Sequence, residues 1–148
     1  MPDLGVALLL ANLVATLFMV GVIWFVQIVH YPLFSKVGPE GFVAYAADHS
    51  RLTGYVVGPP MLVEAASALG LVVFPPPGIS AAALWLGLGL VLVVWLSTAL
   101  LQVPRHAALG RGFDLPAHRL LVGTNWVRTV AWSARGLLVT GITAALVV

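Results

Sequence analysis

Residues 65–104, AASALGLVVFPPPGISAAALWLGLGLVLVVWLSTALLQVP, decide the fold, because this stretch contains no Asp, Glu, Lys or Arg. A membrane-spanning helix needs about 20 predominantly apolar residues, so the stretch is long enough for two spans. We predict the break between them at Pro75-Pro76-Pro77-Gly78, because consecutive prolines remove backbone donors and glycine permits a reversal of the chain. The stretch therefore predicts two antiparallel membrane helices joined by a short loop.

The rest of the chain has the same apolar character. Of its 148 residues, 61% are hydrophobic and 8% are charged, whereas soluble domains carry about 25% charged residues. Residues 4–35 also lack Asp, Glu, Lys and Arg, and this run is longer than the apolar region of about 7–15 residues in a signal peptide. We therefore predict an all-α polytopic membrane protein with a single domain, residues 1–148, that forms an antiparallel four-helix bundle.

The predicted spans cover residues 4–30, 52–74, 81–104 and 117–147, with boundaries good to about 2–4 residues. Gly38-Pro39-Glu40 is typical of a helix start, and the apolar residues after it recur at helical spacing. We expect a short interfacial helix over about 39–51, between the first two spans and running into the second.

Composition also excludes several classes of function. The chain has no cysteine, which rules out disulfides, thiolate metal sites and cysteine nucleophiles. No P-loop and no Gly-x-Ser-x-Gly motif occurs, so nothing indicates a nucleotide-binding protein or a serine hydrolase. The net charge is +2, but basic residues in so apolar a chain are better explained by membrane topology, and we expect no nucleic-acid partner.

The distribution of basic residues predicts the orientation. Four spans place both termini on one side with the 75–78 loop, and the 31–51 and 105–117 connections on the other. All seven basic residues lie in these connections or in the span that follows the second one: Lys36, Arg51, Arg105, Arg111, Arg119, Arg128 and Arg135. The positive-inside rule then places the connections in the cytoplasm. We expect a bacterial-type inner membrane protein with both termini outside.

Two ionisable side chains are predicted to meet in the middle of the membrane. At about 1.5 Å per residue, Glu64 lies roughly 15 Å from the outer end of its span and Arg135 roughly 18 Å from the outer end of its own. A lone charge there costs about 2.5–3.5 kcal/mol or more, so we expect an ion pair, with Asn12 and Thr16 near enough to hydrogen-bond it. The pair is either a structural lock or part of a functional site, in which Glu64 and Arg135 are candidate catalytic residues.

A second polar level is predicted nearer the cytoplasm, about 28–35 Å from the outer ends of the helices. On the fourth span, Asn125, Arg128, Trp132 and Arg135 follow one stripe at helical spacing. Pro59-Pro60 removes two helical donors and favours a kink, which indicates a pocket open to the cytoplasm. We take Arg128 as a third candidate catalytic residue, and as candidate substrate-binding residues Gln27, Gln102, Asn125, Trp132 and Trp24, although the last also fits an interfacial aromatic belt.

The four histidines all lie at the predicted cytoplasmic side. Neutral imidazole is a common metal ligand, so haem or a His-ligated metal is one hypothesis, with His30, His49 and His106 as tentative ligands. No His-x-x-His or Glu-x-x-His spacing occurs. The alternative is that these side chains are interfacial and wetted by headgroups.

The stretch NWVRTVAWSARG at 125–136, with Gln102-Val103-Pro104 before it, resembles the C-terminal half of small four-helix bacterial membrane proteins of the anthrone-oxygenase-like group. The resemblance covers the last two spans. It implies oxygenation of a polyketide-like aromatic, or a related redox reaction, with Asn125, Arg128 and Trp132 as matching positions. Residues 51–61 also resemble membrane protoporphyrinogen oxidases that bind haem, but those proteins carry histidine inside their helices, whereas here the histidines lie at helix ends.

These features predict an oxidoreductase or oxygenase-like enzyme that binds a lipophilic small molecule in a cytoplasm-facing polar pocket. Glu64 would accept a proton, while Arg128 or Arg135 would stabilise an enolate, phenolate or carboxylate. The alternative is a small-solute or proton transporter that uses the Glu64/Arg135 pair. A transporter with four spans predicts a homo-oligomer with its polar stripe at a subunit boundary, whereas an enzyme predicts a pocket enclosed in one chain.

Overall fold

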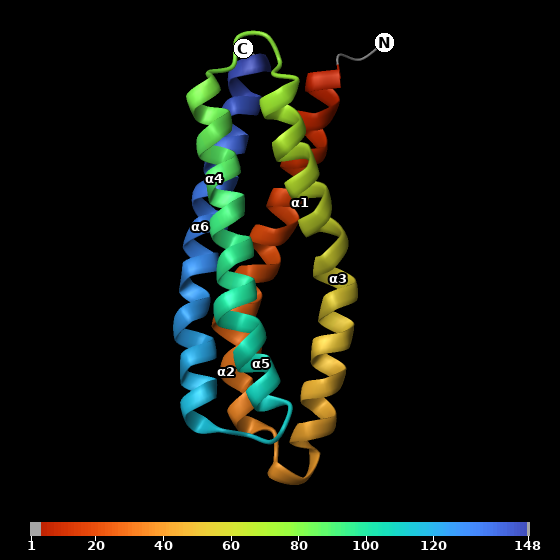
Figure 1. The fold of residues 1–148 in the computed structure, drawn as a ribbon, viewed down its shortest axis with the longest axis vertical. Coiled ribbons are helices and arrows are strands. Elements are labelled where there is room, and N and C mark those ends of the chain that lie inside the picture. The colour runs from red at the N-terminus through yellow and green to blue at the C-terminus, as the bar shows by residue number, and fades with distance from the viewer. Residues whose placement is uncertain (1–3, 148) are drawn as a thin grey trace.

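The computed structural model describes residues 4–147, which form four long antiparallel helices and no strand (Figure 1). Helix α1 (Leu4–Phe25) continues through a π-helical turn, η1 (Val26–His30), into α2 (Tyr31–Leu33) and the 3-10 turn η2 (Phe34–Lys36). Helix α3 covers Pro39–Val73. Helix α4 (Ala81–Ser97) passes through a second π-helical turn, η3 (Thr98–Gln102), into α5 (Val103–Leu109), and α6 covers Leu115–Val147.

The all-α four-helix fold predicted from the sequence is confirmed. Four segments are long and apolar enough to cross a membrane: Leu4–Lys36, Pro39–Val73, Ala81–Leu109 and Leu115–Leu146. The first three are longer than predicted, because π-helical and 3-10 turns carry the first and third helices past their expected ends. The expected interfacial helix is the beginning of α3, which continues without a break through Pro59 and Pro60.

The bundle has two distinct ends (Figure 1). Helix α1 begins and α6 ends at the same end as the loop between α3 and α4, and Gly78 in that loop has a φ of 82°. The short connections that follow η2 and α5 lie at the opposite end. Helix α1 packs against α3 and α6, and α6 also packs against α4.

Apolar side chains cover much of the outside of the bundle, and polar side chains are buried inside it. Leu137, Val14 and Leu100 are exposed by 78%, 69% and 68%, as expected for side chains that face acyl chains. The interior has three apolar clusters, which include Leu9 and Val139 near the loop end, Met19 and Val94 in the middle, and Phe34 and Leu121 near the opposite end. Two groups of buried polar residues accompany these clusters.

Candidate functional site

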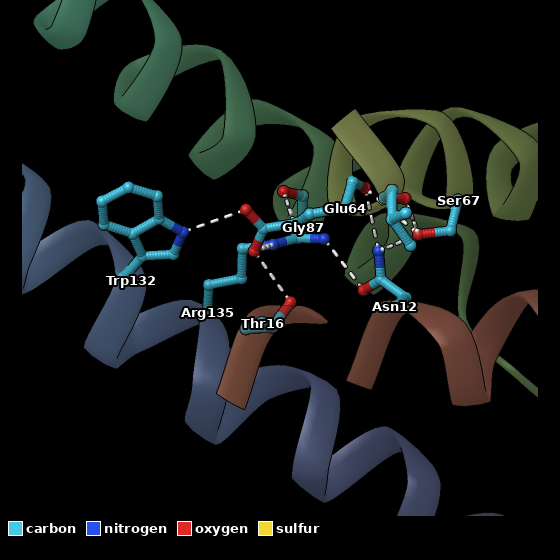
Figure 2. A network of polar contacts seen from close by, with 8 residues as sticks. Asn12, Thr16, Glu64, Ser67, Gly87, Trp132 and Arg135 are labelled. Atoms are coloured by element: carbon cyan, nitrogen blue, oxygen red, sulfur yellow. Dashed lines mark hydrogen bonds and ion pairs between the residues drawn. The ribbon is translucent and has the colours of Figure 1, made fainter. Parts of the chain in front are cut away.

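The first polar group is the predicted ion pair, which the structure confirms (Figure 2). Arg135 of α6 donates from Nε to Oε1 of Glu64 on α3 over 2.8 Å, and both side chains are 1% exposed. Thr16 of α1 donates to the same carboxylate oxygen at 2.8 Å. Trp132 donates from its indole nitrogen to Oε2 of Glu64 at 2.9 Å. Three helices therefore meet at one carboxylate.

The guanidinium of Arg135 is held equally firmly (Figure 2). It donates from Nη2 to Oδ1 of Asn12 at 2.9 Å and from Nη1 to the backbone oxygen of Gly87 on α4. Asn12 in turn donates to the backbone oxygen of Glu64 at 3.0 Å and to Ser67 at 2.8 Å. This group, Asn12, Thr16, Glu64, Ser67, Gly87, Trp132 and Arg135, is named the Glu64 cluster below.

The Glu64 cluster has room for little besides its own side chains. The cavity beside Arg135 and Asn12 has a volume of about 20 Å³, which is enough for one water molecule. Both carboxylate oxygens of Glu64 already accept hydrogen bonds. This geometry favours the structural-lock interpretation, because a substrate has no space beside the carboxylate.

The second polar group is centred on Arg128, two turns before Arg135 on α6. Its side chain is 8% exposed. It donates from Nε to Oδ1 of Asn125 at 2.9 Å, from Nη2 to the hydroxyl of Tyr31 at 3.2 Å and from Nη1 to the hydroxyl of Thr98 at 3.4 Å. Its guanidinium carbon also lies 5.9 Å from the centre of the Trp132 ring. In the part of the chain that the structure describes, no carboxylate pairs with Arg128.

Asn125 is itself held from α1. Its Nδ2 donates to Oε1 of Gln27 at 2.8 Å, and the Gln27 amide donates from Nε2 to the backbone oxygen of Val122 at 3.2 Å. Thr129 donates to the same Gln27 oxygen at 3.3 Å. These bonds fix the Asn125 amide with its oxygen toward Arg128, so Gln27 and Asn125 act as the support of the guanidinium.

Tyr31 connects Arg128 to a histidine. The Tyr31 hydroxyl lies 2.9 Å from Nε2 of His106 on α5. Because a guanidinium can only donate, the Tyr31 oxygen accepts from Arg128, and its own hydrogen is left for His106. In neutral His106, Nε2 is then the acceptor and Nδ1 carries the hydrogen. The backbone oxygen of Tyr31 lies 2.8 Å from Nε2 of His118, which ties α2 to α6.

A second pair of histidines lies beside the first. Nε2 of His30 lies 2.7 Å from Nδ1 of His49, and the Thr53 hydroxyl lies 3.1 Å from the same His49 nitrogen. Two protonated nitrogens cannot share such a contact, so at least one of these two imidazoles is neutral. The ring centres of His49 and His106 are 5.2 Å apart and the planes are inclined by 30°.

Arg128, Tyr31, His49 and His106 line a cavity of about 420 Å³ between α3 and the η3–α5 segment. A neighbouring cavity of about 440 Å³ lies between α1 and α3 and includes His30, and Thr53 and Val57 line both. The polar groups in the wall of the 420 Å³ cavity include Tyr31, His49, Thr98, Gln102, His106 and Arg128. We call this space the Arg128 cavity.

The two π-helical turns bring residues into this cavity, and each lies just before a proline. Pro32 follows η1 and Pro104 follows η3. A proline lacks the N–H that would bond to the carbonyl four residues earlier, which leaves Ile28 and Leu100 without their usual partners. A widened turn is frequent at functional sites. Here Tyr31 directly follows the first widened turn, and Thr98 and Gln102 lie in the second.

The tentative metal ligands come together, but their donor atoms do not converge. His30 and His49 face each other, and His106 faces the Tyr31 hydroxyl. Within residues 4–147, no three His, Asp or Glu side chains are arranged to hold one metal ion. The residues in this arrangement therefore do not fit a three-ligand metal site.

The predicted site residues thus fall into three places. Glu64, Arg135 and Trp132 belong to the Glu64 cluster. Arg128 and Gln102 line the Arg128 cavity, and Gln27 and Asn125 support Arg128 from behind. Trp24 lies apart: it is 43% exposed, donates to Ser133 at 3.0 Å and contacts the Trp126 ring.

Sequence reasoning did not select Tyr31, Thr98 or Thr53, which complete the cavity wall. The helical spacing does place Tyr31 on the same polar stripe as Gln27, and Thr98 on the same stripe as Gln102, one turn away in each case. Comparison of the chain with protein-family models, with curated proteins and with solved structures gave no match.

Proposed function

We propose that the protein is a membrane enzyme that binds a lipophilic small molecule carrying an ionised oxygen atom. The oxygen would be held by Arg128, and the apolar part of the molecule would lie in the Arg128 cavity. The observation that carries this proposal is a buried guanidinium in a cavity wall, with no carboxylate beside it among the described residues.

The charge of Arg128 supports this proposal. A guanidinium that is buried inside a protein loses its hydration, and such a charge is normally paired. Arg135 is paired with Glu64, whereas Arg128 has only neutral partners, Asn125, Tyr31 and Thr98. An enolate, phenolate or carboxylate would supply the missing negative charge.

The same wall carries groups for proton transfer. His106 and His49 line the cavity, and the first accepts a hydrogen bond from Tyr31. A neutral imidazole within reach of a substrate proton is a common general base. Both nitrogens of His106 are occupied, Nε2 by the Tyr31 hydroxyl and Nδ1 by its own hydrogen, so we assign the proton-accepting role to Nε2 of His49, whose Nδ1 faces His30. Glu64 does not line the cavity.

For the reaction we propose oxygenation of an enolisable aromatic substrate, the class that the resemblance of residues 125–136 implies. Removal of a proton would give an enolate held by Arg128, which reacts with molecular oxygen. The balanced conversion turns a ring CH₂ and O₂ into a ring carbonyl and water. We also propose that the Arg128 end of the bundle faces the cytoplasm in a bacterial inner membrane, because the basic residues gather there.

The transporter alternative receives less support from the burial of the polar residues. Gln27, Asn125 and Arg128 are 3%, 0% and 8% exposed within a single chain. A polar stripe at a subunit boundary would be open on the surface of one chain. The burial therefore favours a pocket enclosed by one bundle.

The proposal is tested by binding of 2-naphthoate, a lipophilic carboxylate, to the full chain in lipid nanodiscs. Equilibrium dialysis with empty nanodiscs as the blank separates binding from partitioning into lipid. We expect Arg128→Gln to weaken 2-naphthoate binding about 10- to 100-fold, because a hydrogen bond to a charged group contributes about 1.5–3 kcal/mol. The neutral analogue 2-naphthamide should bind more weakly to the wild-type chain and respond little to the substitution.

Arg119→Gln is the matched control, since it removes an exposed arginine from the same helix. It should leave 2-naphthoate binding unchanged. Equal binding to the wild-type chain and to Arg128→Gln would refute the proposal. Oxygen uptake with an anthrone, and its loss in Arg128→Gln, tests the reaction class separately.

A further inference from the structure

We propose that Gln102 is a specificity-determining residue whose Oε1 accepts a hydrogen bond from a hydroxyl group on the ligand. The inference rests on the proposed function and narrows its substrate class to lipophilic acids that also carry a hydroxyl donor. Gln102 lines the Arg128 cavity but has no part in the proposed proton transfer.

The orientation of the Gln102 amide follows from its neighbour on α6. The Thr124 hydroxyl donates to the backbone oxygen of Leu120 at 2.6 Å, so its single hydrogen is already used. Thr124 can therefore only accept from Gln102, and it does so from Nε2 at 3.0 Å. A 180° flip of the Gln102 amide would break this hydrogen bond to Thr124. Oε1 is thereby held on the side away from Thr124.

That oxygen has no hydrogen-bond partner among the described residues, although Gln102 is only 1% exposed. A buried acceptor without a partner costs about 1–3 kcal/mol, and most buried polar atoms in proteins have one. Gln102 lines the Arg128 cavity. A molecule in that cavity with an O–H group would therefore supply the missing donor.

The position of Gln102 relative to Arg128 sets the spacing of the two groups on the ligand. Nη1 of Arg128 lies 3.4 Å from the hydroxyl of Thr98, which is four residues before Gln102 on the same helical segment. Thr98 and Gln102 thus contribute to the cavity wall from the two ends of the π-helical turn η3. The acidic oxygen and the hydroxyl should accordingly sit on different parts of the ligand, as on opposite rings of a fused aromatic acid.

The test compares 2-naphthoate with its 5-, 6- and 7-hydroxy and 5-, 6- and 7-methoxy derivatives in the nanodisc dialysis experiment. A methoxy group can accept a hydrogen bond but cannot donate one. We expect at least one hydroxy isomer to bind about 3- to 10-fold more tightly than 2-naphthoate, as one neutral hydrogen bond provides, and its methoxy partner to show no gain. This ligand comparison needs no variant, so it holds even if a substitution impairs folding.

Gln102→Met should abolish the difference in affinity between the favoured hydroxy isomer and 2-naphthoate. Ser97→Ala is the matched control, because Ser97 is also a buried hydroxyl without a partner among the described residues but does not line the cavity. Ser97→Ala should retain the tighter binding of the hydroxy isomer relative to 2-naphthoate. Two results would overturn the inference and leave the proposed function standing. In the first, 2-naphthoate binds in an Arg128-dependent way but no hydroxy isomer binds more tightly. In the second, the tighter binding of the hydroxy isomer persists in Gln102→Met. Loss of Arg128-dependent binding altogether would overturn both.

Discussion

Arg128 and Arg135 lie on the same face of α6, yet they are surrounded by different chemistry. Arg135 donates to a carboxylate, an amide oxygen and a backbone oxygen, and its charge is balanced inside the bundle. Arg128 donates to an amide and two hydroxyls and lines a cavity. One arginine is thus built into the helix packing, and the other lies in the wall of a cavity without a charged partner among the described residues.

Replacement of Glu64 by Gln distinguishes a structural role of the Glu64–Arg135 pair from a role in ligand binding. The change would leave the buried Arg135 charge unpaired, and removal of one partner of a buried pair costs about 3–5 kcal/mol. We expect Glu64→Gln to lower the free energy of unfolding by about this amount, measured by denaturant titration in detergent micelles. The affinity of the folded fraction for 2-naphthoate should stay within about threefold of the wild-type value.

The double variant Glu64→Gln/Arg135→Gln provides the control. Since it leaves no unpaired charge, it should recover part of the stability lost in the single variant. If Glu64→Gln instead kept its stability and lost ligand binding or activity, Glu64 would be a functional residue, as the sequence also allowed, and not a lock.

At the scale of helices, glycine lets α4 and α6 approach each other beside the Glu64 cluster. A Cβ atom at Gly87 would lie 3.2 Å from Nη1 of Arg135, which is tighter than ordinary van der Waals contact. That nitrogen cannot move away easily, because it donates to the backbone oxygen of Gly87 and its side chain is held by Glu64 and Asn12. At Gly89, two residues further on, a Cβ atom would have no neighbouring atom within 4 Å.

We therefore expect Gly87→Ala to destabilise the fold by about 1–3 kcal/mol, as overpacking of a filled interior does. Gly89→Ala should be neutral or stabilise by up to about 1 kcal/mol, because alanine has the higher helix propensity. Unfolding midpoints of the two variants, measured side by side in the same micelles, test this. Equal destabilisation by both would show that the contact with Arg135 does not matter.

The four helices and the Glu64–Arg135 pair could be predicted from the sequence, whereas the Arg128 cavity could be predicted only in part. The apolar composition, the uncharged runs at 4–35 and 65–104 and the proline-rich loop are sufficient to predict the four helices. Depth along the helices was sufficient to pair Glu64 with Arg135, because an unpaired charge in hydrocarbon is costly. The Arg128 cavity was only partly predictable: counting residues along a regular helix cannot anticipate the π-helical turns η1 and η3, which change the direction of the side chains that follow. The contact of Tyr31 with His106 joins α2 to α5, and no sequence spacing encodes it.

In the whole molecule, the two polar groups lie at different levels of one bundle. The Glu64 cluster joins α1, α3, α4 and α6 in the half that contains the loop between α3 and α4, as the packing of Asn12, Ser67 and Gly87 shows (Figures 1 and 2). The Arg128 cavity lies toward the opposite end, where η1, η3 and α5 replace regular helix. A fully hydrogen-bonded ion pair lies inside the first half, and the Arg128 cavity lies in the other half.

This arrangement predicts which face of the membrane each end occupies. The chain has no cysteine, so single-cysteine variants report one position each. Ser80→Cys lies at the exposed start of α4, and Ser35→Cys lies at the exposed end of the first long helix, on the other side of the bundle. In intact bacterial spheroplasts, a membrane-impermeant maleimide should label Ser80→Cys strongly and Ser35→Cys only after lysis, because the basic connections are retained in the cytoplasm. Labelling in the reverse order would invert the topology and place the Arg128 cavity toward the outside.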